Sequence, residues 1–167
     1  MRSIAILLAL GALCAGCGTY RWTSSVPAGM RTVAVPTFAN ASDVTELGAV
    51  ASREILREFQ REGTFRVAGR DEAAVEVQGE ILEVGGGRGY GGRSIGMRLA
   101  EYRVSARVKV SVIDRRSGRV LVDGRVYEPT ATFAAGDDLL TARRDASGRL
   151  AEDLARQVVD DVLGCQW

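Results

Sequence analysis

The sequence predicts an α+β protein: a two-layer sandwich in which a mostly antiparallel four-stranded sheet carries two amphipathic helices on one face. Residues 101–114 alternate between apolar and polar side chains, which is typical of a strand with one buried and one exposed face. Apolar residues recur about every fourth position in residues 43–62 and again in 137–163, as in helices that bury one side. Two helices cover only one face of such a sheet, so we expect the other face to be open.

The chain begins with a segment that has the features of an export signal. Arg2 supplies a positive charge, and residues 4–13 form an apolar stretch of about ten residues, shorter than the roughly twenty that span a membrane. Cys14-Ala15-Gly16-Cys17 resembles a lipobox, in which small residues precede an acylated cysteine, although Cys14 stands where Leu, Val or Ile is usual. We predict a lipoprotein signal peptide over residues 1–16 and lipidation of Cys17. An ordinary secretory signal cut after Gly16, without lipid, is the alternative.

A short tether separates this signal from the folded part. Residues 17–29 are polar and contain Pro27, so we expect them to join the lipid to a single domain over residues 30–167. Gly18 follows Cys17 at a position where Asp commonly retains lipoproteins in the inner membrane. The sequence is therefore compatible with an anchor on the periplasmic face of the outer membrane.

Composition excludes several classes of function. Lys and Arg number 22 against 21 Asp and Glu, so net charge gives no drive toward nucleic acid. Histidine is absent, which removes the usual general base and the commonest metal ligand. With Cys14 in the signal and Cys17 lipidated, Cys165 is a lone thiol of open role, and no zinc site can be built. We expect no enzyme activity, no metal and no cofactor.

The first half of the domain is expected to be strand, helix, strand. Residues 31–38 (RTVAVPTF) are β-branched and predict a strand, with Pro36 near its end or at an edge. Asp43 and Glu46 have the form of a capping box at the start of the helix, and Gly63 is expected just past its end. Residues 64–67 follow as a short strand.

The second half is expected to be a meander of strands and a closing helix. Residues 73–84 predict a strand whose apolar side chains change parity, which indicates a bulge near Ile81. The long strand over 101–114 leads into the hairpin loop DRRSG, where Gly118 is expected to need a positive φ. A return strand runs from Val120 to Tyr127, and the final helix covers 137–163 with Gly164 at its end.

Residues 85–98 (GGGRGYGGRSIGMR) have the most unusual composition in the chain. They hold seven glycines and three arginines without an acid, which resembles an RNA-binding tract, but export carries the chain away from RNA. Two interpretations stay open: a flexible connection between strands, or a mobile basic loop that orders against a partner or an anionic lipid. In the second, Arg88, Arg93 and Arg98 make the contacts, because a guanidinium binds phosphate through two parallel hydrogen bonds.

A second group of cations lies on the polar parity of the long strand. Arg103, Arg107 and Lys109 alternate with apolar residues and are expected on the open face of the sheet. A solvated face explains them, and so does contact with a partner or a lipid phosphate. No His accompanies the Ser and Thr residues, so a hydrolase site has no base.

Taken together, these motifs resemble the lipopolysaccharide-assembly lipoproteins of the LptE type. The resemblance rests on a signal ending in Cys-Gly and on segments along nearly all of the mature chain: TVAVPTFAN, the helix ending at Gly63 before TFRV, VEVQGEILEV, YRVSARVKVSVIDRRSGRVL and the closing helix. It implies a sandwich anchored in the outer membrane that pairs with a large β-barrel (LptD), plugs it and assists lipopolysaccharide transport. The lipobox and Thr19, between Gly18 and Tyr20, depart from the family pattern.

A different class of function is the alternative. Val33 to Val67 is also similar to the N-terminal part of CsgG-like outer-membrane lipoproteins, which form homo-oligomeric secretion rings. Such rings need additional membrane strands, and the one insertion available, residues 85–98, is too rich in glycine and too polar for them. A small periplasmic enzyme is a third hypothesis and lacks a base.

Overall fold

The computed structural model describes residues 26–88, 100–135 and 139–167. Its elements follow in the order 3-10 helix η2 (Ala28–Met30), β1 (Thr32–Ala34), β2 (Ala39–Asn40), α2 (Leu47–Glu62), β3 (Arg66–Val67), β4 (Val75–Arg88), β5 (Ala100–Asp114), β6 (Val120–Tyr127), β7 (Thr130–Ala135) and α3 (Leu139–Leu163). None of the described helices is long and apolar enough to cross a membrane.

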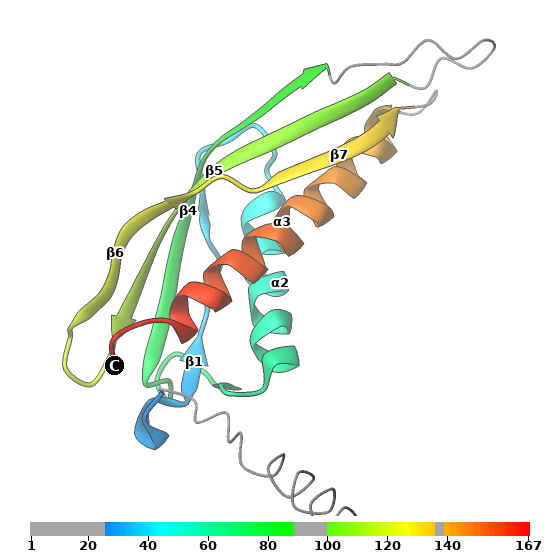
Figure 1. Cartoon of the computed structure of the whole chain (residues 1–167). Coiled ribbons are helices and arrows are strands. Elements are labelled where there is room, and N and C mark those ends of the chain that lie inside the picture. Colours follow the sequence, from blue (N-terminus) through cyan, green and yellow to red (C-terminus); the bar gives the residue numbers. More distant parts are fainter. Residues whose placement is uncertain (1–25, 89–99, 136–138) are drawn as a thin grey trace, which may run out of the picture.

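The two helices lie side by side on one face of a sheet, as predicted (Figure 1). The apolar side chains predicted for one side of each helix form one layer of the core. The apolar side chains of β4 and β5 form the opposing layer. Because apolar burial contributes roughly 25 cal/mol per Å², these facing rows provide most of the drive for folding. The core residues are Leu47, Ala51, Ile55 and Phe59 of α2; Leu150, Leu154, Val158 and Val162 of α3; and Val75, Val77, Ile81, Val108, Val110 and Val112 of the sheet.

The sheet is mixed and has seven strands, so the predicted four-stranded sheet is not matched in number, and three short parallel pairings join the three antiparallel ones. Its order is β3-β1-β4-β5-β6, with β2 beside β4 and β7 beside β5. β1 is parallel to β3 and β4 because α2 carries the chain back to the end where β1 began. The strand predicted over 31–38 is interrupted at Val35, before Pro36, and resumes as β2.

β7 is a strand that the sequence pattern does not reveal. Its sequence, TATFAA, has only six residues, three of them alanines, and it follows β6 after only two residues. Both strands pair antiparallel with β5: β6 with the second half and β7 with the first half. Pro129 lies between them and contributes its carbonyl, which accepts the amide of Ala106 at 3.1 Å. One long return strand is therefore divided in two.

The start of α2 differs from the predicted capping box. The helix begins at Leu47, and Glu46 at its N-cap makes no side-chain capping bond. Instead the Asn40 side chain holds the preceding turn: its amide donates to the carbonyl of Val44 at 2.7 Å, and its oxygen accepts the amide of Ser42 at 2.9 Å. The predicted end is confirmed, because Gly63 has φ 84° and donates its amide to the carbonyl of Phe59 at 3.1 Å.

The central hairpin confirms one prediction and corrects another. The register of β4 against β5 shifts between Ile81 and Glu83, where the parity change indicated a bulge. The first four residues of the glycine-rich segment, 85–88, are not a loop: they continue β4 and pair with residues 102–105 of β5. Strand pairing uses only backbone amide and carbonyl groups, so the glycines at 85–87 can pair with β5 although they have no side chains. Gly118 in the β5–β6 turn has φ 73°, as predicted.

The chain between β1 and β2 is fixed by close packing. The Phe38 ring covers Gly79 of β4 so closely that a Cβ there would lie 2.1 Å from a ring carbon. The hydroxyl of Ser52 accepts the amide of Phe38 at 2.8 Å and lies 3.0 Å from the carbonyl oxygens of Pro36 and Gly48. These contacts hold a short, irregular segment against both layers.

A buried carboxylate closes one end of the sheet. The Glu76 side chain, at the start of β4, accepts hydrogen bonds from Gln78 at 2.9 Å, from Arg70 and from Arg115. Burial alone would raise the pKa of Glu76, but the bonds from Gln78, Arg115 and Arg70 outweigh it and hold the pKa below 4.5. Glu76 therefore joins the β3–β4 loop to the β5–β6 hairpin as an anion.

Gly79→Ala is expected to lower the free energy of unfolding by about 1–3 kcal/mol, because the new methyl group must displace the Phe38 ring. Gly148→Ala is the matched control: nothing lies within 4 Å of a Cβ at this position of α3, so stability should rise by about 0.5–1 kcal/mol. Urea denaturation monitored by circular dichroism measures both. If both variants changed the free energy of unfolding by the same amount in the same direction, the close packing of Phe38 on Gly79 would be contradicted.

Glu76→Gln is expected to lower the free energy of unfolding at pH 7 by about 1–3 kcal/mol, since the charged partner of two arginines is lost. A depressed pKa contributes stability that is complete above the unfolded-state pKa, near 4.5, and disappears as the pH falls through the folded-state value. The wild type should therefore lose stability in acid more steeply than the variant. Denaturation curves between pH 7 and pH 3 test this, and parallel pH profiles would refute it.

Candidate functional site on the open face of the sheet

The face of the sheet turned away from α2 and α3 carries the predicted row of cations. Along β5, Arg103, Arg107 and Lys109 are exposed, while Ala106 and Val108 between them are buried. The alternation of the sequence is therefore preserved in the structure, and the three cations share one side of one strand. Register pairing places Gly87 and Thr132 beside Arg103, Glu83 beside Arg107, and Glu80 and Val126 beside Lys109.

Arg107, at the centre of the row, is engaged with two carboxylates. Its Nη1 lies 3.2 Å from Oε1 of Glu83 on β4, and its Nε lies 3.6 Å from Oε1 of Glu128 between β6 and β7. All three side chains are half-exposed or more, so each ion pair contributes at most about 1 kcal/mol. Their main effect is to neutralise Arg107 locally. Neither acid was singled out from the sequence, because the pairing that brings them together is long-range.

The two outer cations of the row have no such partner. Among the described residues, no carboxylate lies within ion-pair distance of Arg103 or Lys109. Arg103 is in register with Gly87 on one side and Thr132 on the other. A glycine has no side chain, so the residue of β4 that faces Arg103 offers it no side-chain partner.

Lys109 depends on a glycine in the neighbouring strand. A Cβ on Gly124 of β6 would lie 2.7 Å from the Cε of Lys109, so the lysine side chain runs across a space that only glycine leaves. Gly124 has φ 54°, a conformation that favours glycine, and it donates its amide to the Ser111 hydroxyl at 3.0 Å. The direction of Lys109 is thus determined by β6.

The structure brings together only part of the predicted site. Arg88 is the last residue of β4 and is in register with Tyr102, which has the parity opposite to Arg103 along β5, so the register does not place Arg88 in the cation row. Cys17, Arg93 and Arg98 lie outside the described residues. Sequence reasoning missed Thr130 and Thr132, which stand beside Ser105 and Arg103, because β7 itself was missed.

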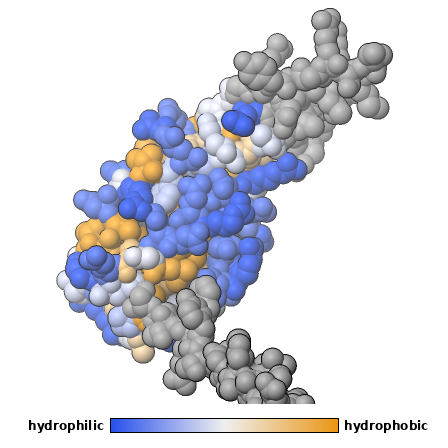
Figure 2. All heavy atoms as spheres, in the orientation of Figure 1, coloured by the Kyte–Doolittle hydropathy of each residue, from blue (hydrophilic) through white to orange (hydrophobic). Residues whose placement is uncertain are grey.

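The opposite side of the molecule is mostly hydrophilic. Figure 2 shows the helix side with hydrophilic surface over α2 and α3 and smaller apolar patches toward β6. This agrees with the mixed charges on the outer side of α2, where Arg57 pairs with Glu54 and Arg61 with Glu58. The helices therefore expose an ordinary solvated surface.

A polar cluster joins β6 to the end of α3. Asp161 accepts hydrogen bonds from the Tyr127 hydroxyl at 2.6 Å and from Arg125. Burial opposes its charge, but these two bonds lower the pKa of Asp161, whereas burial and the Asp161 contact raise that of Tyr127. The Cys165 thiol donates to the carbonyl of Asp161 at 3.3 Å, and burial raises its pKa. Burial and the nearby Asp161 charge thus disfavour the thiolate form of Cys165.

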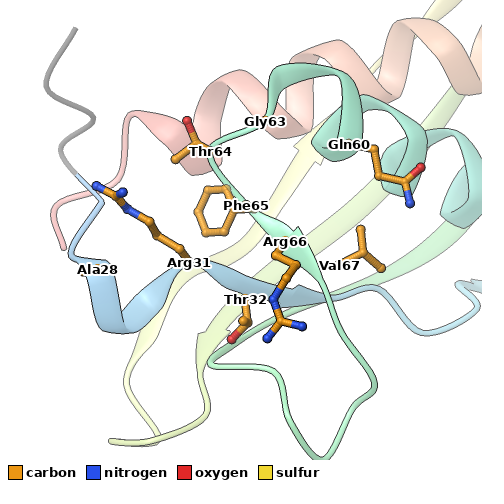
Figure 3. A pocket seen from close by; sticks show the side chains of 9 residues that line it. All are labelled: Ala28, Arg31, Thr32, Gln60, Gly63, Thr64, Phe65, Arg66 and Val67. Carbon is orange, nitrogen blue, oxygen red and sulfur yellow. The ribbon is translucent and has the colours of Figure 1, made fainter. Parts of the chain in front are cut away.

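A hollow at the β3 edge does not form a second site. Its lining comes from η2, the start of β1, the end of α2 and β3 (Figure 3). Figure 3 shows Arg31 and Arg66 extending away from each other, so they do not converge on one anion. The Thr64 hydroxyl beside them already contacts the Glu62 carboxylate at 2.6 Å. The described residues also contain no cluster of three metal-ligating side chains.

Comparison with solved structures identifies the fold. A candidate lipoprotein from Caulobacter crescentus CB15 is 15% identical, covers 81% of this chain and 91% of its own, and gives a TM-score of 0.52. The hypothetical protein CT253 from Chlamydia trachomatis is 18% identical, with 80% and 95% covered and a TM-score of 0.52. These identities are low, so they show a shared architecture and nothing more.

Comparison with sequence families is more informative. No curated protein matches the sequence. The family model described as "LptE: Lipopolysaccharide-assembly" matches residues 30–162, from η2 to the last turn of α3. That match covers most of the chain and all strands of the sheet described above. This chain therefore belongs to the LptE lipopolysaccharide-assembly family.

Proposed function

We propose that this chain is a non-enzymatic outer-membrane lipoprotein that partners an LptD-like β-barrel, plugs it and assists lipopolysaccharide transport to the cell surface. The observation that carries the proposal is the family match over residues 30–162. The match spans the whole two-layer domain, so it concerns the complete fold and not one recurring motif.

The open face of the sheet supports a lipopolysaccharide-binding role. Lipopolysaccharide carries phosphate groups, and the exposed, unpaired cations Arg103 and Lys109 can bind them through charge-assisted hydrogen bonds. Arg107, already held by Glu83 and Glu128, contributes less net charge but orders the strand between them. Arg88, Arg93 and Arg98 extend this candidate contact along the chain from the same end of β4.

The proposed anchor accounts for how the domain stays at the membrane. With residues 1–16 removed as a signal and Cys17 acylated, residues 17–25 connect the lipid to Val26, the first described residue. Nine residues of extended chain span at most about 30 Å. The tether thus keeps the domain within roughly one bilayer thickness of the periplasmic face of the outer membrane.

Family membership also bears on the alternative of a CsgG-like ring. The LptE model matches across the whole domain, whereas the CsgG-like similarity concerns only Val33 to Val67. A homo-oligomeric ring would appear as a high mass in detergent solution. The mass of a single copy, alone or in complex with a barrel, would favour the proposed function over the ring.

Affinity purification of the tagged full-length chain from detergent-solubilised outer membranes is expected to recover a large β-barrel protein in equal stoichiometry. Mass spectrometry of the eluate identifies it. Recovery of a homo-oligomer without a barrel would overturn the proposed partnership and support the ring.

Cys17→Ser tests the anchor in the same preparation, because it removes the acylated thiol. We expect the wild type in the membrane fraction with the mass of a triacylated N-terminus, and the variant in the periplasm. Cys165→Ser is the matched control and should remain in the membrane. A variant that fractionates like the wild type and shows no change in mass would rule out lipidation at Cys17.

Arg103→Glu combined with Lys109→Glu is expected to weaken binding of purified lipopolysaccharide at least about tenfold, since two attractive contacts become repulsive. Surface plasmon resonance at low ionic strength measures it. Arg53→Glu combined with Arg57→Glu, on the outer side of α2, is the charge-matched control and should bind like the wild type. Unchanged binding by a folded Arg103/Lys109 variant would exclude this face as the contact.

A further inference from the structure

The edge formed by β6 and β7 is the long free edge of the sheet. These two strands follow one another along β5 and have no further strand beside them among the described residues. Edge strands present unpaired amide and carbonyl groups on alternate residues, which readily pair with another strand. The question is what occupies those groups in this protein.

On β7, two of the outward-facing backbone groups are occupied by side chains of α3. The amide of Thr130 donates to Oδ2 of Asp153 at 3.1 Å, and the carbonyl of Thr132 accepts Nη1 of Arg149 at 2.8 Å. The carbonyl of Pro129, the preceding residue, is instead bonded to Ala106 of β5. Inward and outward backbone groups therefore alternate along β7 as in a regular antiparallel strand. The outward amide of Thr130 binds a carboxylate, and the outward carbonyl of Thr132 binds a guanidinium.

The two side chains are held in position by α3 itself. Arg149 and Asp153 are four residues apart, so they project from the same side of the helix one turn apart. The carboxylate of Asp153 also accepts Nε2 of Gln157 at 3.0 Å and Nη2 of Arg156 at 3.3 Å. These bonds fix the carboxylate of Asp153 at the edge of β7.

Two other edge strands are irregular or short, and the second half of β4, residues 83–88, has only β5 beside it among the described strands. β6 contains Gly124 at φ 54°, and its register with β5 shifts on both sides of Val112. Such a strand cannot offer a regular row of groups to a partner. At the opposite edge, β3 is only two residues long. β7 is regular, and its protection depends on side chains.

We propose that Arg149 and Asp153 form an edge guard that prevents β7 from pairing with the same strand of a second copy of this chain. The guard keeps the domain monomeric by occupying two of the groups that a second β7 would bind. It goes beyond the proposed function and depends on neither the lipid nor the barrel.

The test is Arg149→Ala combined with Asp153→Ala, compared with Arg53→Ala combined with Glu152→Ala. Both pairs remove one positive and one negative charge from exposed or partly exposed helix positions, and only the first pair contacts β7. The mature chain is studied in density-matched detergent by sedimentation, and amide hydrogen exchange is followed at Thr130. Circular dichroism confirms folding.

We expect the guard variant to show a dimer whose fraction rises with concentration, while the wild type and the control remain monomeric. A folded guard variant that stays monomeric over the same range overturns the proposal. If that variant does not fold, hydrogen exchange of the wild type provides the test. The proposal requires the Thr130 amide of the wild type to exchange at least about tenfold more slowly than in an unfolded chain. Exchange at the unfolded rate overturns it. Asp153→Asn retains an oxygen acceptor and should behave like the wild type.

Discussion

The antiparallel pairing of β4 with β5 is the interaction on which the rest of the structure depends. β4 joins the parallel strands β1 and β2, and β5 joins β6 and β7, so each of these reaches the sheet through one of the two. The same pair supplies the apolar row beneath both helices and the cation row on the open face. Period-two alternation in β5 therefore builds the core and the candidate site at once.

Most features determined by local chemistry could be predicted, the capping box at Asp43 and Glu46 being an exception, and features determined by distant pairing could not. The apolar stripes of both helices, Gly63, Gly118 and the bulge near Ile81 each rest on a pattern within a few residues. β7 could not be found, because TATFAA becomes a strand only when β5 stands beside it. The parallel strands also follow from where α2 returns the chain, which a linear pattern does not specify.

The candidate site shows the same division. The alternation of β5 predicts that Arg103, Arg107 and Lys109 share a face, and they do. It cannot indicate that Arg107 is held by Glu83 of β4 and by Glu128 between β6 and β7, while Arg103 and Lys109 have no ion pair among the described residues. Which of the three cations is neutralised therefore depends on which segments lie beside β5, and the sequence of β5 alone does not specify this.

The glycines at the end of β4 make the length of this hairpin easy to change during evolution. Residues 85–87 have no side chains to fit into the core, and the bulge between Ile81 and Glu83 already sets the register of everything before them. Insertions or deletions beyond this point leave the packed rows of both layers in place. The end of the hairpin between β4 and β5 can therefore differ in length and charge while the scaffold stays unchanged.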